Sequence, residues 1–323
     1  MQTKVAIVTG GARGIGRGCA LELARQGFEI ALVDLLEPEM ERTRSELEAL
    51  GQRATCHGAD VAEFRRAGEV VRLEHEAQGR VDVLVNNAGK ANSAGILEIT
   101  EDAFDRTIAI NLKSCFNYIH HVAPIMLAQG GDRIISMSSL NALSGGVTAA
   151  VSRFSYAAAK AGILGMTRAL AKELAPTILV NAICPGVIET ELGNSIARAR
   201  GPELARGIAL GRLGSPSDLA NVVAFLASSE PCFITGIHHR RLSVQRLRRT
   251  PWRTTPLKLW ATSRARERRH ERSGRRVVAE RRRTPNAFGD AGADKPILDV
   301  LPSRQPWPTL RLYLLWRLKN APP

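Results

Sequence analysis

Short apolar runs alternate with longer helical patterns through most of the chain, and this alternation constrains the fold more than any other feature. The runs are, in order, KVAIVTG, EIALVD, ATCHGADV, VDVLVNNAG, DRIISMSS and ILVNAICPG. Consecutive apolar positions are typical of strands that a parallel sheet buries on both faces. Helical patterns fall between them, for example at residues 15–26, 39–50, 63–78, 101–128 and 155–174. Right-handed crossovers join strands separated in this way, so the sequence predicts an α/β fold with a doubly wound parallel sheet.

Charge divides the chain into two parts. Residues 1–237 hold 23 Lys and Arg against 25 Asp and Glu, whereas residues 238–323 hold 22 basic and six acidic residues. The sequence pI near 10.3 therefore describes the second part, and the nearly neutral first part lacks the charge of a nucleic-acid-binding protein. We predict one domain over residues 1–237 and a basic, disordered tail over residues 238–323.

Cysteine and histidine usage indicates neither a disulfide framework nor a metal site. The five cysteines are odd in number, widely spaced and never form a C-x-x-C pair, which favours reduced thiols. Histidine pairs at 120–121 and 238–239 have no Cys, Asp or Glu at metal-ligand spacing. The N-terminus runs directly into an apolar strand, and no apolar run reaches the roughly 18 residues of a membrane span. We expect a cytoplasmic protein with no membrane contact.

A glycine-rich turn, TGGARGIG at residues 9–16, follows the first predicted strand and opens the first predicted helix. Gly10 allows a tight turn, Gly14 lets the backbone approach a pyrophosphate, and Gly16 lets helix and strand pack closely. Free N–H groups and the positive end of the helix dipole favour phosphate at this place. The glycines alone would also fit a purely structural turn, but their position between strand and helix favours a dinucleotide site.

The end of the second predicted strand favours NAD as the cofactor. Asp34 stands there, 18 residues beyond Gly16. A carboxylate at this position accepts hydrogen bonds from the adenine-ribose hydroxyls and repels a 2′-phosphate. Arg13 in the glycine loop favours the opposite choice, but Leu35 and Leu36 follow Asp34 instead of a second basic residue. NAD is therefore the predicted cofactor, with NADP as the alternative.

Tyr156 and Lys160 stand four residues apart in SYAAAK, so they share one face of a predicted helix. A free tyrosine has a pKa of about 10, and a nearby ammonium group lowers that pKa because it stabilises the phenolate. On its own, this spacing is typical of a solvated helix face. After a nucleotide loop and a strand that ends in MSSLNA, it indicates a general acid or base.

Together, TGGARGIG, GADV, NNAG, NLKS, SMSS, YAAAK and CPGVIET resemble the motifs of the short-chain dehydrogenase/reductase family. The resemblance covers residues 3 to about 236 and is greatest to the 3-oxoacyl-[acyl-carrier-protein] reductase-like branch. It implies a single-domain Rossmann fold. It also implies an enzyme that binds NAD or NADP and transfers a hydride between the nicotinamide and a carbonyl or secondary alcohol.

The resemblance further implies roles for single residues. Tyr156 would be the general acid or base, and Lys160 would lower its pKa and hold the nicotinamide ribose. Ser139, the last serine of SMSS, would bind the substrate oxygen, and Asn111 of NLKS would hold a helix bend and a proton-relay water. With the glycine loop and the end of the second strand, the expected cofactor-binding residues are Gly10, Arg13, Gly14, Ile15, Gly16, Asp34, Asp60, Val61, Asn87, Ala88, Gly89, Tyr156, Lys160, Pro185, Gly186, Val187, Ile188 and Thr190.

Departures from the family pattern concern the substrate. Ser139 and Tyr156 are 17 residues apart, a few more than is usual in the family, so the extra residues in SGGVTAAVSRF should form a looser loop at the mouth of the site. MLAQGGD replaces the basic residues that fatty-acid reductases of the family carry before the fifth strand, and only Lys172 matches a second basic position. We therefore expect a small carbonyl or alcohol substrate, with an acyl carrier protein doubtful. Within that class a 3-oxoacyl thioester, a sugar and a polyol stay open.

The last part of the chain also departs from the family. A predicted helix at residues 189–210 still occupies the place of the family's mobile substrate lid. After ITG, however, relatives continue into a last strand that ends in a VDGG-like turn and borders a subunit contact, whereas this chain continues IHHRRLSVQRLRR. We predict that the last strand is missing or altered and that the homo-oligomer expected for the family is weakened.

Three explanations of the tail stay open. A reading-frame change after about Ile237 is favoured over an unspecialised extension and over a nucleic-acid-binding arm, so we expect no specific nucleic-acid partner. The arm would make the chain a binding protein with a nucleotide fold, which is the second functional class. The residues Tyr156, Lys160, Ser139 and Asn111 favour the enzyme, because a binding protein would not need them.

Overall fold

The structure is a computed structural model that describes residues 3–145, 153–191 and 194–239. All of these residues belong to one compact unit, Met1–Pro251. The predicted tail beyond residue 239 and most of the loop predicted within SGGVTAAVSRF lie outside the described residues. Both therefore stay predictions.

The described residues form a parallel sheet of seven strands in the order β3-β2-β1-β4-β5-β6-β7. The strands are β1 (Val5–Thr9), β2 (Glu29–Asp34), β3 (Ala54–Gly58), β4 (Val83–Asn86), β5 (Asp132–Met137), β6 (Ile178–Ile183) and β7 (His238–His239). The order reverses between β1 and β4, which makes this pair the topological switch point where a doubly wound sheet binds ligands. The predicted fold class is confirmed.

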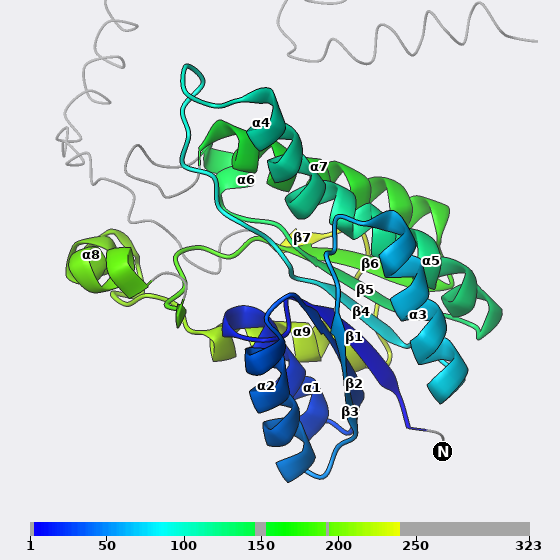
Figure 1. Ribbon diagram of the computed structural model, residues 1–323. Coiled ribbons are helices and arrows are strands. Elements are labelled where there is room, and N and C mark those ends of the chain that lie inside the picture. Colours follow the sequence, from blue (N-terminus) through cyan, green and yellow to red (C-terminus); the bar gives the residue numbers. More distant parts are fainter. Residues whose placement is uncertain (1–2, 146–152, 192–193, 240–323) are drawn as a thin grey trace, which may run out of the picture. The chain divides into compact units, whose positions relative to one another are not determined.

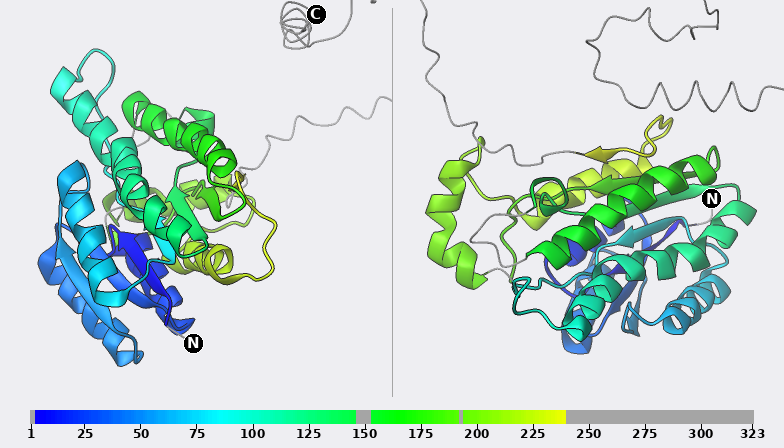
Figure 2. Two further views of the ribbon diagram at one scale, coloured as in Figure 1. Left: turned by 90° about the vertical axis from the view of Figure 1, so that its right-hand side faces the viewer. Right: turned by 90° about the horizontal axis from the view of Figure 1, so that it is seen from above.

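Helices cover both faces of this sheet (Figures 1 and 2). They are α1 (Gly14–Arg25), α2 (Glu37–Ala49), α3 (Phe64–Gln78), α4 (Glu101–Ile108), the π-helix η1 (Ala109–Lys113), α5 (Ser114–Ala128), α6 (Asn141–Ser144), α7 (Phe154–Glu173), α8 (Asn194–Gly207) and α9 (Pro216–Ser228). One buried cluster packs α1, α2 and α9 against the sheet, and a second packs α3, α5 and α7. The strands therefore have apolar neighbours on both sides, which explains their unbroken apolar runs.

The predicted helix over residues 101–128 is one helical segment in three parts, α4, η1 and α5. Helices α6 and α9 were not among the predicted helices. Helix α9 carries a local signal nonetheless, because Ser215 and Asp218 form a capping box at its start and Pro216 takes its first position. It packs against α1 so closely that a Cβ on Gly18 would come within 3.0 Å of the Pro216 side chain.

The last described strand, β7, contains two residues and pairs in parallel with Ala182 and Ile183 of β6. The segment before it is held by the middle of β6, since the Gly236 N–H donates to the Val180 carbonyl at 2.8 Å. The Asn181 side-chain amide likewise donates to the Ile234 carbonyl at 2.8 Å. The ITG segment is therefore hydrogen-bonded to β6. Because the described residues end at His239, the predicted alteration of the last strand stays a prediction.

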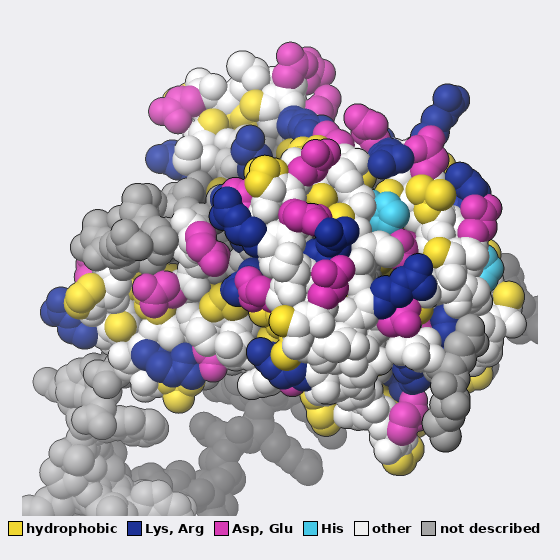
Figure 3. Space-filling model, turned by 60° about the horizontal axis from the view of Figure 1, so that its bottom comes forward, with side chains coloured by type: hydrophobic (Ala, Val, Ile, Leu, Met, Phe, Trp, Pro, Cys, Tyr) yellow, Lys and Arg dark blue, Asp and Glu magenta, His cyan; other side chains and the backbone are white. Residues whose placement is uncertain are grey.

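The surface of the described domain carries charges of both signs. Figure 3 shows Lys and Arg side chains interspersed with Asp and Glu side chains on one face. The domain also has ion pairs between neighbouring turns of one helix, such as Arg72 with Glu76 and Arg66 with Glu69 on α3. This mixture agrees with the near balance of charge over residues 1–237.

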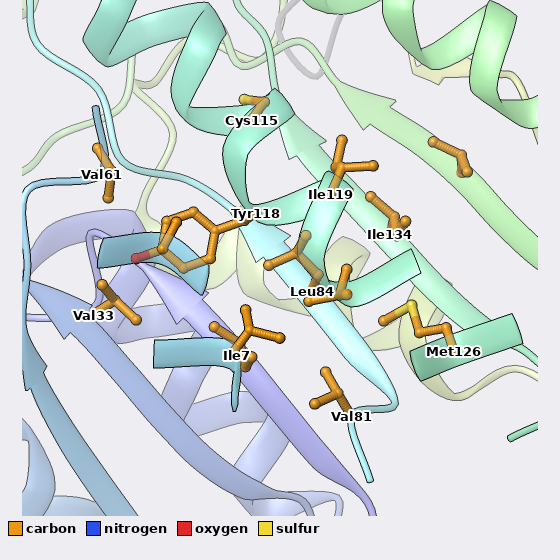
Figure 4. Packing of buried hydrophobic residues seen from close by; sticks show 14 of the residues in the cluster. Ile7, Val33, Val61, Val81, Leu84, Cys115, Tyr118, Ile119, Met126 and Ile134 are labelled. Carbon is orange, nitrogen blue, oxygen red and sulfur yellow. The ribbon is translucent and has the colours of Figure 1, made fainter. Parts of the chain in front are cut away.

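The aromatic ring of Tyr118 from α5 is fully buried among Ile7, Val33 and Val61 (Figure 4). Its hydroxyl has no hydrogen-bond partner among the described residues, and burial raises its pKa. A buried polar group without a partner costs free energy. Replacing Tyr118 with Phe should therefore raise the free energy of unfolding by about 1 kcal/mol, measured by urea denaturation.

The matched control is Thr9→Val, which also removes a buried hydroxyl. The Thr9 hydroxyl accepts hydrogen bonds from the Asn87 and Ala88 N–H groups at 3.0 and 3.1 Å. This variant should lose about 1–3 kcal/mol, because two buried donors lose their acceptor. A comparable loss in Tyr118→Phe would mean that its hydroxyl has a partner, such as a bound water.

Candidate active site

A cavity of about 570 Å³ opens at the carboxyl ends of the strands. The segments that follow β1, β2, β3, β4, β5 and β6 all contribute to its lining, on both sides of the β1–β4 switch point. Seventeen of the predicted site residues line it: Gly10, Arg13, Gly14, Ile15, Asp34, Asp60, Val61, Asn87, Ala88, Gly89, Ser139, Tyr156, Lys160, Pro185, Gly186, Ile188 and Thr190. Parallel strands bring these distant segments to one edge of the sheet.

Three predicted residues do not line the cavity. Gly16 is buried behind the glycine loop, and Asn111 is buried beneath Lys90. Val187 is 37% exposed and is not part of the lining. Gly16 and Asn111 therefore adjoin the backbone of lining residues, namely Gly10 and Lys90.

The glycine loop has the backbone that the sequence predicted. Gly10 and Gly14 have φ angles of +66° and +58°, which residues with a Cβ rarely adopt. A Cβ on Gly16 would lie 2.0 Å from the carbonyl oxygen of Gly10. Arg13 precedes α1 without a capping side-chain hydrogen bond. The N-terminus of α1 is thus open to an anion from the cavity.

Asp34 is held rigidly at the end of β2. Its carboxylate accepts hydrogen bonds from the backbone N–H groups of Ala12, Leu35 and Leu36, at 3.2, 2.8 and 3.2 Å. These donors come from both the glycine loop and the turn after β2. The carboxylate is consequently a fixed negative charge in the cavity lining.

Asp60, in the turn after β3, is a second fixed carboxylate. One oxygen accepts the Ala62 N–H at 3.0 Å, and the other accepts the Arg106 guanidinium at 2.6 Å. Partial burial acts to raise the pKa of Asp60, but the Ala62 hydrogen bond and Arg106 outweigh it and hold the pKa below its usual value.

Asn87 connects the end of β4 to the glycine loop. Its side-chain amide donates to the carbonyl oxygens of Thr9 and Gly10 at 3.0 and 3.1 Å. Its backbone N–H donates to the Thr9 hydroxyl at 3.0 Å. The two halves of the switch point are therefore joined by hydrogen bonds directly under the cavity.

Helix α7 places Tyr156 and Lys160 on the cavity wall. The Lys160 side chain is 3% exposed, and its Nζ lies 5.7 Å from the centroid of the Tyr156 ring. Nζ donates to the Met137 carbonyl at 2.8 Å, and the Ser138 hydroxyl donates to the Lys160 carbonyl at 2.8 Å. These bonds fasten α7 to the end of β5, beside Ser139.

Asn111 lies in η1 and connects two walls of the site. Its side-chain amide donates to the Thr107 and Lys90 carbonyl oxygens, both at 2.9 Å, and its Oδ1 accepts the Lys90 N–H at 3.0 Å. The bond to Thr107 uses a backbone carbonyl of the helix as its acceptor, next to the π-helical turn η1. Asn111 thereby fixes the backbone after Gly89.

Ten further residues line the cavity and were not predicted from the sequence: Val33, Leu35, Leu36, Ala59, Lys90, Ala91, Arg106, Ile110, Met137 and Ser138. Most of them adjoin a predicted residue in the chain, and that proximity could have indicated them. Arg106 has no such signal. It reaches the cavity because α4 packs next to the turn after β3.

The residues present fit a dinucleotide. The glycine loop is a cradle that side chains on Gly10 or Gly14 would disturb, and a Cβ on Gly89 would come within 3.4 Å of Lys160 Nζ. The Lys160 ammonium has three donors, and in the described part of the chain one of them is taken, by Met137. Two donors remain for polar groups of a bound ligand.

Comparison with known proteins agrees with this geometry. A family model described as enoyl-(acyl carrier protein) reductase matches residues 10–240. The chain is 39% identical over 242 residues to the oxidoreductase UcpA of Escherichia coli O157:H7, covering 72% of this chain and 90% of that protein. It is 37% identical over 238 residues to the 3-oxoacyl-[acyl-carrier-protein] reductase FabG of Thermotoga maritima, covering 73% and 95%.

Solved structures share the fold. The crystal structure of gox2181 matches with a TM-score of 0.69 and 33% identity, covering 74% of this chain and 94% of that chain. Levodione reductase matches with a TM-score of 0.68 and 28% identity, covering 74% and 95%.

The fold and the cavity define an oxidoreductase that acts on CH–OH or carbonyl groups with a nicotinamide cofactor, NAD or NADP. The chain belongs to the short-chain dehydrogenase/reductase family. In the described ranges, no helix is long and apolar enough to cross a membrane. The same residues bring together no group of three or more His, Cys, Asp or Glu side chains that could hold a metal ion.

Proposed function

We propose that this protein is an NAD-dependent oxidoreductase of a small carbonyl or secondary alcohol, of the 3-oxoacyl reductase type. One observation carries the proposal. Tyr156 and Lys160 share a single cavity with the open N-terminus of α1 and the Asp34 carboxylate. One bound dinucleotide and its substrate could therefore contact the glycine loop, Lys160 and Tyr156 at the same time.

The chain's own residues account for the proton chemistry. When bound, the nicotinamide supplies or accepts the hydride. In the reductive direction the Tyr156 hydroxyl gives its proton to the substrate oxygen, and the Lys160 ammonium stabilises the phenolate that remains. Ser139 donates a second hydrogen bond to the same oxygen. Asn111 holds the Lys90 backbone in position through two hydrogen bonds, and the family resemblance implies that it also holds a proton-relay water.

Asp34 supports NAD over NADP, since its carboxylate is fixed by three N–H donors and would repel a 2′-phosphate. Asp34→Ala should therefore shift the ratio of kcat/KM for NADH over NADPH toward NADPH by about 10- to 100-fold. Steady-state kinetics with both cofactors measure this ratio. Glu41→Ala, which removes a half-exposed carboxylate from α2, is the control and should leave the ratio unchanged. An unchanged ratio in Asp34→Ala would assign the choice to another group, such as Arg13.

The substrate class is tested by a screen of the purified protein. Ketones, 3-oxoacyl thioesters, sugars and polyols are each offered with NADH and NADPH, or with the oxidised forms. We expect turnover of 3-oxoacyl thioesters, by analogy with the FabG relatives. Turnover of sugars or polyols alone would favour the alternative. The segment before β5 lacks basic residues, which argues against a substrate that must be attached to an acyl carrier protein.

The binding-protein alternative depends on the tail. If residues 240–323 are deleted, any sticking to nucleic acid should disappear while NADH binding stays intact, because the described site lies before residue 191. Salt-sensitive, sequence-independent association of the full chain would reflect the tail's charge. Loss of NADH binding on deletion would contradict a dispensable tail. The homo-oligomer and the cytoplasmic location also stay proposals.

A further inference from the structure

Arg106 is a cavity-lining residue without an assigned role. It belongs to the last turn of α4, and its guanidinium donates to Oδ2 of Asp60 at 2.6 Å. The two residues are 46 positions apart in the chain, and both line the cavity. Their side chains are 51% and 19% exposed, respectively.

The pair joins two walls of the cavity. Asp60 belongs to the turn after β3, whereas the helix of Arg106 continues into η1 with Ile110 and Asn111. The second Asp60 oxygen is held by the Ala62 N–H. With both oxygens engaged, the carboxylate has one orientation, and that orientation depends on Arg106.

This ion pair differs from the other exposed pairs of the domain. Arg72 with Glu76, and Arg66 with Glu69, join neighbouring turns of α3 and do not reach the cavity. Such pairs contribute little to stability. Arg106 is 51% exposed and Asp60 19% exposed, so one partner stays in solvent and we expect a small stabilising effect from this pair as well. Its distinguishing property is its position at the cavity.

Charge gives the pair a second consequence. Among the residues that the structure describes, Asp34 and Asp60 are the two carboxylates in the lining. A dinucleotide brings a pyrophosphate with further negative charge. A carboxylate without a cationic partner would repel the pyrophosphate and so weaken dinucleotide binding. Arg106 neutralises Asp60, whereas Asp34 has no ion-pair partner among the described residues.

We propose that Arg106 is a positioning residue, which holds and neutralises the Asp60 carboxylate so that this wall of the cavity can receive the dinucleotide. The inference rests on the proposed function. It concerns binding of the dinucleotide and leaves the reacting groups on α7 untouched.

The first test is NADH affinity, measured by the change in nicotinamide fluorescence on titration. Arg106→Ala should weaken NADH binding about tenfold, the effect expected of one charge-assisted hydrogen bond at a half-exposed site. The kcat at saturating NADH should stay within about twofold of the wild type, because the groups that move protons are unchanged. Arg106→Lys should recover part of the affinity, because it keeps the charge and loses the guanidinium geometry.

Arg72→Ala is the matched control, since it removes an arginine from an exposed ion pair outside the cavity. Its NADH affinity should equal that of the wild type. Thermal melting of each variant shows whether it is folded, and Arg106→Gln, which keeps most of the side chain, replaces Arg106→Ala if the latter does not fold.

A double-mutant cycle with Asp60→Asn separates the proposed role from a direct contact. If Arg106 acts through Asp60, adding Arg106→Ala to Asp60→Asn should weaken NADH binding by less than about twofold. A full tenfold loss in that background would overturn the proposal. So would unchanged affinity in both Arg106→Ala and Arg106→Gln. If the wild type itself binds no NADH, the proposed function fails, and the two failures are thereby distinguished.

Discussion

Tyr156→Phe should lower turnover by about 10²–10⁴-fold, because it removes the proton that the substrate oxygen must receive. The aromatic ring stays in place beside Lys160, so NADH affinity should change little. Turnover is measured with any substrate found in the screen, and NADH binding by fluorescence titration. The expected combination is a large loss in kcat with an almost unchanged dissociation constant.

Tyr118→Phe is the matched control for this variant. It removes the same hydroxyl from a tyrosine that is buried in the core and does not line the cavity. Its turnover should equal that of the wild type. Substantial residual turnover in Tyr156→Phe would contradict the assignment of Tyr156 as the proton donor, independently of the result for Tyr118→Phe.

Gly16→Ala should have the second large effect. An added Cβ would lie 2.0 Å from the Gly10 carbonyl oxygen and 2.6 Å from the side-chain nitrogen of Asn87. Both atoms belong to the network that joins β1, β4 and α1, so no flexible side-chain end can move aside. We expect a loss of about 3 kcal/mol in the free energy of unfolding, together with a large loss of NADH affinity.

Gly165→Ala is its control. Gly165 lies on the exposed side of α7, and a Cβ there meets no atom within 4 Å. Alanine is the better helix former, so this variant should gain up to about 1 kcal/mol. Urea denaturation and NADH titration of both variants provide the comparison. Wild-type stability and NADH affinity in Gly16→Ala would show that the glycine loop can rearrange and is not the rigid cradle described above.

The strands, the longer helices and the glycine loop could be predicted because their signals lie within a few neighbouring residues. Apolar runs mark strands buried on two faces, and the glycines mark a turn between strand and helix. Helix α9 shows the limit of this approach: its capping box is a local signal, but its packing place beside α1 is not.

The candidate site was predictable to a similar extent. Motifs in the expected order identified most of the lining, including Asp34 and the pair Tyr156 and Lys160. The motifs assigned packing of helix and strand to Gly16 and a helix bend to Asn111, but they did not show which lining residues the two contact. Those contacts depend on which backbone atoms the folded chain places around each residue.

Hydrogen bonds between distant residues were decided by tertiary structure alone. Asn87 is 78 residues from Thr9, and it reaches the Thr9 carbonyl because the crossovers make β4, and not β3, the neighbour of β1. Arg106 meets Asp60 because α4 lies beside the turn after β3. Local sequence carries propensity and periodicity, which act over a few residues. Partners across the sheet depend on strand order and helix packing, which the whole chain establishes by burying its apolar faces.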